Sequence, residues 1–418
     1  MSKEIIKSDG NFSTQNIIEI QGLNFGINDN KILKNISLCI KAGEFVGLIG
    51  PNGAGKTTLL KCINGINKAD GVIKIKDMPI EKLSDKKLAK DVSLMHQNTA
   101  ISFPFAAIEV VMMGRYPYLK RLQRESKEDY NVAKKNMEYT DTISLEKSLI
   151  TEMSGGERQR VLFAKTLTQE TDVILLDEPT ASLDITYQEQ IFKYSKELSM
   201  QGTTVVAAIH DLKIAGRYCN RLVLMNKGQI VADGSPEEVL TSKNLSQVYG
   251  INALVYRNRI TGSLDIYIHN QDDSKRSEKV HVLGGGGSAS AVLRQLYERG
   301  YNISTGVFSH GDSDIGSAEV FGIEHLVEKP FSEISEQLNN ENITLIKNSD
   351  MVILCNMPFG NQNLRNLEAA KYAGRLVIIE DDSPETRDFT NGKATQIYNE
   401  LKKNAVAVIT SAQLHEVL

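Results

Sequence analysis

The sequence predicts an α/β protein of two domains, and three observations support this. Short runs of β-branched and other apolar residues alternate with helical patterns from about residue 16 to residue 270. Residues 271–279 then carry no large apolar side chain and hold six charged ones, as expected of a solvated linker. The same alternation restarts after this linker and continues to the end of a chain whose 418 residues exceed the usual size of a single core. We therefore expect one domain at 16–270 and a smaller one at 280–418.

The expected strands of both domains lie at their apolar runs. In the first domain these runs are residues 17–25, 44–50, 72–76, 173–177, 203–210 and 221–234. In the second domain they are residues 281–284, 302–309, 351–356, 375–381 and 405–410, with a helical pattern at 291–300. The second set predicts a small parallel, Rossmann-like sheet. The phosphate-binding and serine-glycine motifs described below occur once each, which excludes a second catalytic cassette.

The net charge of −4 is unevenly distributed along the chain. Residues 281–418 hold 11 Lys and Arg against 18 Asp and Glu, which gives −7 and leaves +3 for residues 1–280. An acidic region of this kind is a poor partner for nucleic acid, so we expect no nucleic-acid binding. The longest apolar runs are too short to cross a bilayer, and the first 20 residues lack the apolar core of a signal peptide. We expect the chain to remain in the cytoplasm.

A strand pattern, a glycine-rich loop and a helical pattern follow one another around residue 50. This order is the context that a phosphate-binding loop requires. The glycines let backbone N–H groups turn inward, and the following helix N-terminus adds unpaired donors. We expect Lys56 to reach the β- and γ-phosphates and the Thr57 hydroxyl to bind Mg²⁺. A glycine turn that binds nothing is disfavoured by Lys-Thr at this offset. The candidate ATP-binding residues here are Gly50, Pro51, Asn52, Gly53, Ala54, Gly55, Lys56, Thr57 and Thr58.

Two carboxylates end the buried strand pattern at residues 173–177, where ligands of open α/β sheets collect. We expect Asp177 to hold Mg²⁺ through a water. Glu178 is placed to orient or deprotonate the attacking water in a phosphoryl transfer. Two acids at a strand end are by themselves more typical of a helix cap or a surface pair. The phosphate loop upstream favours the catalytic interpretation.

Ser154, Gly155 and Gly156 lead into an amphipathic helical pattern and form a second anion-binding N-terminus. Together with the phosphate loop and the acidic strand end, this segment resembles ATP-binding-cassette ATPases. The signature of that family usually reads LSGGQ and here runs from Met153 to Glu157. The resemblance implies a P-loop NTPase cassette with a RecA-like core, an antiparallel β subdomain and a helical subdomain. It also implies a head-to-tail homodimer, in which the signature contacts the γ-phosphate of ATP bound to the partner.

The remaining motifs of that family occur in its order. Gln97 matches the Q-loop, residues 181–184 match the D-loop, and His210 matches the switch histidine. The resemblance implies that Gln97 senses Mg²⁺ and the attacking water, that His210 bonds the γ-phosphate, and that Asp184 links the two active sites. Taken singly, Gln97 is typical of a polar loop residue and His210 of a structural histidine. Their joint occurrence favours the assignment.

The position that commonly carries an adenine-stacking ring in that family holds Ile27 here. Phe25, two residues earlier, could replace the ring only if the loop shifted. Loss of the ring would forfeit roughly 1 kcal/mol of stacking, by analogy with aromatic pairs. We expect weaker nucleotide affinity or weaker base selectivity.

Residues 108–118, IEVVMMGRYPY, resemble the subfamily that serves iron-siderophore, haem and cobalamin importers. The resemblance implies that Arg115, Tyr116 and Tyr118 contact the coupling helix of a separate membrane permease, which an extracytoplasmic substrate-binding protein supplies. The chain would then work on the cytoplasmic face of the membrane. An amphipathic helix with an ordinary polar face is the alternative for this segment. The alternative function is a soluble cassette ATPase of translation or DNA repair, but those typically carry two cassettes or a long coiled coil.

The second domain offers one candidate ligand loop, Gly284, Gly285, Gly286 and Gly287, between a strand pattern and a helical pattern. Its spacing suits a phosphate or a dinucleotide, but no ribose-binding acid is evident. Asp312 and Asp314 come late after the second strand and could instead cap the next helix. Similar acidic tails on some cobalamin-type cassette ATPases favour a regulatory ligand sensor. A dinucleotide-binding module and a dimerisation module remain as alternatives.

Overall fold

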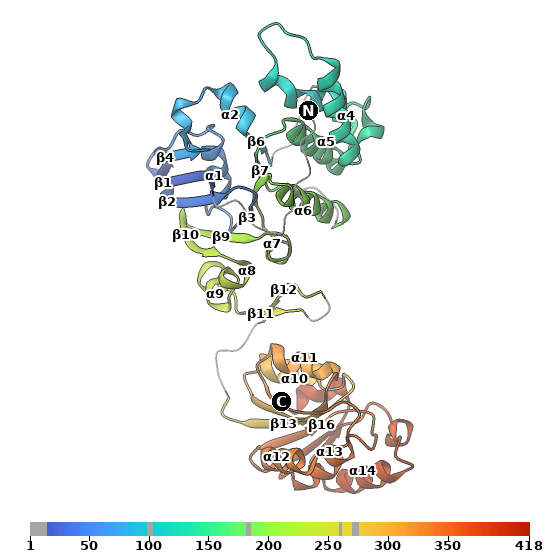
Figure 1. Cartoon of the computed structure of the whole chain (residues 1–418). Coiled ribbons are helices and arrows are strands. Elements are labelled where there is room, and N and C mark those ends of the chain that lie inside the picture. Colours follow the sequence, from blue (N-terminus) through green and yellow to red (C-terminus); the bar gives the residue numbers. More distant parts are fainter. Residues whose placement is uncertain (1–14, 98–102, 181–184, 259–260, 270–275) are drawn as a thin grey trace. The chain divides into compact units, whose positions relative to one another are not determined.

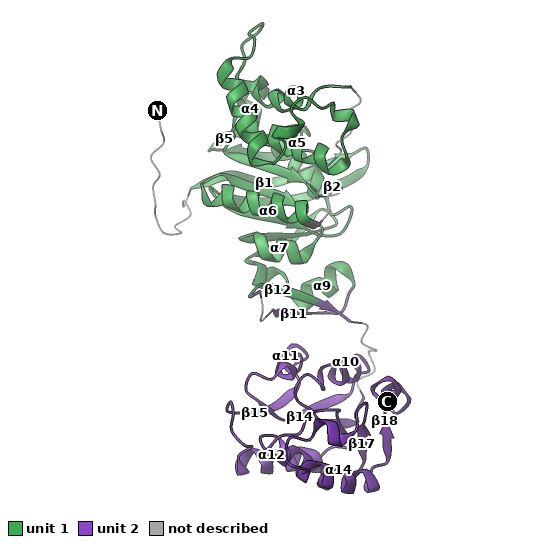
Figure 2. Cartoon of the chain, turned by 90° about the vertical axis from the view of Figure 1, so that its right-hand side faces the viewer, with its two compact units in different colours: residues 1–250, 262–266 green, residues 251–261, 267–418 purple. Residues whose placement is uncertain are grey.

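The computed structural model describes residues 15–97, 103–180, 185–258, 261–269 and 276–418. The chain divides into two compact units, residues 1–250 with 262–266 and residues 251–261 with 267–418 (Figure 2). The boundary between the two units falls within a short segment that forms the strands β11 (Ala253–Arg257) and β12 (Leu264–Ile268). Part of the predicted linker lies outside the described residues. Over the described ranges, no helix combines the length and the apolar character needed to span a membrane.

A six-stranded sheet forms the centre of the first unit (Figure 1). Its order is β10-β9-β3-β8-β7-β6, parallel throughout except for β10. The strands β3, β7 and β8 are buried along their whole length, which explains their continuous apolar sequences. The bounds are β3 Phe45–Ile49, β6 Val92–Met95, β7 Val173–Asp177, β8 Thr204–Ala208, β9 Arg221–Asn226 and β10 Gln229–Gly234, with helices α1 Lys56–Ile63, α6 Ile185–Met200, α7 Leu212–Tyr218, α8 Pro236–Val239 and α9 Ser242–Tyr249.

An antiparallel sheet of order β2-β1-β4-β5 lies beside the parallel sheet and shares its core. On β2 buried and exposed residues alternate, as expected of a strand with one face on a core. Its strands are β1 Asn16–Ile27, β2 Asn30–Lys41, β4 Asp70–Ile75 and β5 Met78–Pro79, and α2 (Asp85–Asp91) follows.

A helical part with a separate apolar core completes this unit. Its core joins residues such as Val110, Met137 and Val161 from three helices. These helices are α3 Ala107–Met112, α4 Lys127–Tyr139 and α5 Gly155–Thr168, and a 3₁₀ segment covers Met113–Tyr118. The predicted combination of parallel sheet, antiparallel sheet and helical part is confirmed.

The second unit is a parallel six-stranded sheet covered by helices on both faces (Figure 1). Its order, β15-β14-β13-β16-β17-β18, is 3-2-1-4-5-6 when the strands are counted along the chain, as in Rossmann folds. One core contains α10 and α11, and the other contains α12, α13 and α14. The bounds are β13 Lys279–Leu283, β14 Asn302–Ser309, β15 Glu324–Glu328, β16 Met351–Leu354, β17 Leu376–Ile379, β18 Ala407–Ile409, α10 Ser290–Glu298, α11 Ser313–Val320, α12 Glu336–Lys347, α13 Leu364–Ala369 and α14 Lys393–Asn404.

Candidate functional site

The glycine-rich loop runs from the end of β3 to the start of α1. Gly50, Gly53 and Gly55 have φ angles of 145°, 79° and 104°, in the region that favours glycine. A Cβ atom on Gly50 would lie 2.1 Å from the Met225 carbonyl oxygen, so no larger residue fits there without movement. The sequence therefore forms a loop whose backbone can approach a ligand closely.

This loop lines a pocket of about 340 Å³. Lys56 is 5% exposed and donates to the carbonyl oxygens of Gly50 at 2.7 Å and Pro51 at 3.2 Å. Burial lowers the pKa of Lys56, and the carboxylates of Glu178 and Asp177 oppose this. The predicted residues that line the pocket are Asn52, Gly53, Ala54, Gly55, Lys56, Thr57, Thr58 and Glu178.

Asp177 ends β7 and is 2% exposed. Its Oδ1 accepts the Thr57 hydroxyl at 2.7 Å. Burial raises the pKa of the Asp177 carboxyl, while the bond from Thr57 lowers it. Of the three residues predicted to contact Mg²⁺, Thr57 and Asp177 are therefore neighbours and offer the oxygen donors that this ion prefers, whereas the Gln97 amide bonds Glu178.

Glu178, Gln97 and His210 are brought together from the ends of three neighbouring strands. The Glu178 carboxylate accepts the Gln97 amide on one oxygen and lies against His210 Nε2 with the other. Glu178 has φ 48°, a left-handed conformation that few residues other than glycine adopt. The three residues predicted to be catalytic thus meet at Glu178, which lines the phosphate pocket.

Ser154 caps α5 at its N-terminus and lies exposed with Gly155, while Gly156 is half-buried. The Glu157 carboxylate accepts the Ser154 N–H at 2.9 Å and its hydroxyl at 2.8 Å, and the Ser154 hydroxyl oxygen accepts the Glu157 N–H at 3.2 Å. This reciprocal cap fixes the turn and lowers the pKa of Glu157. The serine-glycine turn is thus preformed on the surface. Asp184 and the rest of the predicted D-loop lie outside the described residues.

The three predicted permease contacts differ in exposure. Arg115 is 8% exposed, pairs with Asp129 at 3.0 Å and Glu170 at 2.7 Å, and donates to the Thr168 carbonyl oxygen at 3.1 Å. Tyr118 is partly buried and donates its hydroxyl to the Gln169 carbonyl oxygen at 2.9 Å. Tyr116 is 54% exposed. These contacts give Arg115 and Tyr118 a structural role and leave Tyr116 as the available surface residue.

Two pocket residues, Asn30 and Ile32, were not predicted. They belong to β2, which lies against the loop: a Cβ atom on Gly55 would meet Leu33 Cδ2 at 2.8 Å. They belong to none of the predicted motifs. Their position beside the pocket follows from the pairing of β1 with β2, which no motif signals. Ile27 is 57% exposed and pairs with Asn30 across the turn, while Phe25 packs on the core.

The predicted loop of the second unit follows β13 and precedes α10 as expected. Gly284, Gly285 and Gly286 line a separate pocket in that unit, and Gly287 follows directly.

Comparisons with known proteins agree with this geometry. A family model described as ABC transporter matches residues 33–181, and one described as MJ0874 family matches residues 303–415. The cobalamin import ATP-binding protein BtuD of Halobacterium salinarum is 34% identical over 322 residues, which cover 76% of this chain and 80% of that protein. The hemin import ATP-binding protein HmuV of Plesiomonas shigelloides is 38% identical over 254 residues, which cover 56% of this chain and 95% of that protein. The first match extends beyond residues 16–270, whereas the second is no longer than that domain.

Two solved structures are similar to the chain. An ABC transporter of the metal-chelate type in an inward-facing conformation superposes with a TM-score of 0.54 at 25% identity and covers 61% of this chain and 97% of that one. The ATP-binding cassette MJ1267 in its ADP conformation gives a TM-score of 0.51 at 25% identity and covers 57% of this chain and 98% of that one.

Proposed function

Because the chain belongs to the ABC transporter family of ATP-binding proteins, an ATPase family, we propose that its ATP hydrolysis drives an importer for cobalamin, haem or an iron chelate. The cargo class is taken from the relatives, whose names state cobalamin and hemin import. A soluble cassette ATPase of translation or DNA repair is less well supported, since these relatives are import subunits.

One observation carries the catalytic proposal: Glu178, Gln97 and His210 meet beside the pocket that Lys56 and the glycine loop form. Lys56 and the loop N–H groups would hold the phosphates of ATP. Glu178 would orient or deprotonate the attacking water, and the Gln97 amide would position the Glu178 carboxylate. His210 would bond the γ-phosphate once ATP is present.

Mg²⁺ fits the oxygen donors of Thr57 and Asp177 and, when bound, would neutralise the charge of the phosphates. Thr57 would ligate it directly and Asp177 through a water. The 2.7 Å bond between Thr57 and Asp177 holds the two side chains side by side before the ion arrives.

Ser154, Gly155 and Gly156 would complete the site of a second copy, with the γ-phosphate between the two chains. Their exposure and preformed cap support this role, because the turn lies free to meet another copy. Asp184 would link the two sites. The homodimer would act on separate permease subunits at the cytoplasmic face, supplied by an extracytoplasmic binding protein, with Tyr116 as the accessible contact.

For residues 280–418 we keep the role of a regulatory ligand sensor. The pocket beside Gly284–Gly286 supports it, and the extension of the BtuD match beyond residue 270 indicates that such a region also occurs in a relative.

The experiment is purification of the full chain from membranes of its source cells under mild detergent. A polytopic membrane protein should copurify, and adding it should raise ATP turnover. Uptake of labelled cobalamin, haem and an iron chelate by cells with and without the chain then identifies the cargo. Recovery of ribosomes or DNA in place of a membrane protein would reverse the proposal.

A further inference from the structure

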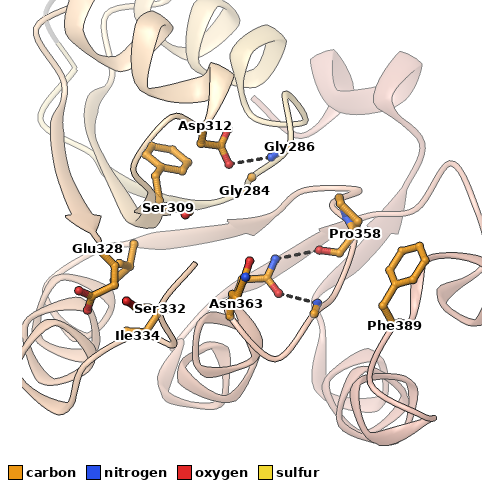
Figure 3. A pocket seen from close by; sticks show the side chains of 15 residues that line it. Gly284, Gly286, Ser309, Asp312, Glu328, Ser332, Ile334, Pro358, Asn363 and Phe389 are labelled. Atoms are coloured by element: carbon orange, nitrogen blue, oxygen red, sulfur yellow. Dashed lines mark hydrogen bonds between the residues drawn. The ribbon is translucent and has the colours of Figure 1, made fainter. Parts of the chain in front are cut away.

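The second unit contains a cavity of about 240 Å³ at the carboxyl ends of its strands (Figure 3). The loops that follow β13, β14, β15 and β16 all contribute to its wall. In a sheet of order 3-2-1-4-5-6, the edge where the strand order reverses is the place where ligands bind. The cavity is also smaller than the 300–1,000 Å³ typical of drug-sized ligands. Its position and size thus indicate a site for one small molecule.

The glycine-rich loop at this cavity has already used its donors on a buried carboxylate. Asp314 is fully buried and accepts the N–H groups of Gly287 and Ala289 on Oδ2, each at 3.1 Å. Its Oδ1 accepts the N–H group and the hydroxyl of Ser290 at 2.8 and 2.7 Å. These are the groups that would hold a phosphate in a dinucleotide-binding loop. Asp314 therefore occupies the phosphate position from within the protein.

A second carboxylate accepts the N–H group of a glycine that lines the cavity. Asp312 Oδ2 accepts the Gly286 N–H at 2.9 Å (Figure 3), and its Oδ1 accepts the Asp314 N–H at 3.0 Å. The Gly285 N–H donates to the Ser288 hydroxyl at 3.3 Å. A phosphate could bind here only by displacing these internal acceptors.

The charge of the cavity also disfavours phosphate. Asp312 and Glu328 line it, and no Lys, Arg or His is among the lining residues in the described part of the chain. Both Glu328 oxygens accept backbone N–H groups, from Lys329 at 2.9 Å and Ser335 at 2.8 Å, and these bonds lower the pKa of Glu328. Glu328 is therefore ionised at neutral pH and retains lone pairs for further donors. A ligand that donates hydrogen bonds suits this end, and an anion does not.

The opposite side of the cavity combines an apolar pair, Pro358 and Phe389, with the polar side chains of Gln362 and Asn363. Phe389 lines it at 73% exposure, and Pro358 lies nearby, across the cavity from Glu328 (Figure 3). Asn363 fixes this loop by donating to the Pro358 carbonyl oxygen at 2.8 Å and accepting the Gly360 N–H at 2.9 Å. An exposed phenyl ring beside a proline offers a flat surface on which a planar ring can stack.

We propose that this cavity binds a nucleoside without phosphate, with its sugar hydroxyls donating to Asp312 and Glu328 and its base against Phe389. The ligand class rests on the sensor role proposed above, to which it gives a chemical identity. Binding and the response of ATP hydrolysis are measured separately, so that the pocket and the sensor role can fail independently.

The binding experiment uses a local fluorescent reporter, since the chain contains no tryptophan. Phe331 is 91% exposed and directly precedes the lining residue Ser332. The full chain with Phe331→Trp is titrated with adenosine, guanosine, cytidine, uridine, the 5′-monophosphate of each and NAD⁺. We expect a saturable change in tryptophan fluorescence with at least one nucleoside. The phosphorylated form of that nucleoside should bind at least about tenfold more weakly, because its phosphate is repelled by the carboxylates of Asp312 and Glu328. The proposal would be overturned if the monophosphate or NAD⁺ bound as tightly as the nucleoside, or if none of the four nucleosides changed the fluorescence.

A matched pair of variants assigns the signal to the carboxylate. Glu328→Gln should weaken nucleoside binding about tenfold, because the side chain that accepts the sugar hydroxyl loses its negative charge. Glu324→Gln changes an exposed glutamate on the same strand, outside the cavity lining, and should leave binding unchanged. Equal effects of the two variants would remove Glu328 from the site. ATP turnover that ignores a nucleoside shown to bind would refute the sensor role but not the pocket.

Discussion

The loops at residues 50–55 and 284–289 both join a parallel strand to a helix, yet their donors have different partners. In the first loop the N–H groups of Gly53 and Gly55 have no acceptor within the described part of the chain, and Lys56 adds a buried cation. In the second loop Asp312 and Asp314 accept the donors, and no lining residue described there is a cation. Glycine spacing allows the backbone to approach a ligand in both. The nearby charges decide whether a phosphate or an internal carboxylate fills the space.

The largest expected effect is a loss of ATP hydrolysis at the first loop with ATP binding retained. Glu178→Gln should lower ATP turnover about a hundredfold to ten-thousandfold, the range of a lost general base, while ATP still binds and holds two copies together. Steady-state hydrolysis and nucleotide-dependent dimer formation measure the two effects. Glu81→Gln, an exposed glutamate of the same unit, serves as control. Substantial turnover in Glu178→Gln would mean that another group activates the water.

The next effect tests whether Asp314 is structural. Asp314→Ala removes the acceptor of four buried or half-buried donors and should lower the free energy of unfolding of the second unit by about 3 kcal/mol or more. Urea unfolding of the full chain, followed through Phe331→Trp, measures this, with the exposed Glu341→Ala as control. A stable Asp314→Ala variant that gains affinity for AMP would show a phosphate loop merely blocked by its own acid.

Lys56→Ala is the counterpart in the first loop. It should weaken ATP binding about tenfold to a hundredfold, the value of one or two charge-assisted hydrogen bonds. The variant should be no less stable, because burial already disfavours the charged form of Lys56. Calorimetric titration and a thermal melt measure both, and Lys68→Ala, an exposed lysine, is the control. Unchanged ATP affinity would overturn the phosphate-loop assignment.

The second unit should lose stability in acid because of one buried histidine. His281 is fully buried, with Nδ1 2.8 Å from the Ser304 hydroxyl and Nε2 3.0 Å from Asn342 Oδ1, and burial lowers its pKa to about 4. The unfolded chain binds a proton below its ordinary pKa of about 6.5, whereas the folded unit does not until about pH 4. The free energy of unfolding of the second unit should therefore decrease as the pH drops from 6.5 to 4, by up to about 1.4 kcal/mol for each pH unit.

Urea unfolding at several pH values checks this slope. His281→Leu should flatten the slope whatever its effect on stability, and the exposed His415→Gln should leave it unchanged. An equal slope in His281→Leu would place the titration elsewhere.

Some features of the two units can be predicted from the sequence and others cannot, for physical reasons. Buried central strands carry continuous apolar runs and were found, whereas β15 was missed because an edge strand with Glu324, His325 and Glu328 has little such signal. Asp312 caps α11, in agreement with its position between the second strand and the next helix. Asp314 also accepts N–H groups of a loop some 25 residues earlier in the chain. These bonds depend on how two βα units pack together, which no local sequence pattern encodes. The burial of Arg115 likewise depends on Asp129 and Glu170 from other elements.

The smallest expected effect concerns the rings of the two pockets. Phe389 faces the cavity of the second unit, whereas the described lining of the phosphate pocket includes no aromatic residue and offers Ile32. Ile27 is exposed beside Asn30 of that lining, so Ile27→Tyr could place a ring against adenine. Stacking of roughly 1 kcal/mol would raise ATP affinity about fivefold and favour ATP over non-aromatic triphosphate. Ile66→Tyr, at a similarly exposed site outside the described pocket lining, should change nothing, and an equal result for both variants would mean that adenine lies elsewhere.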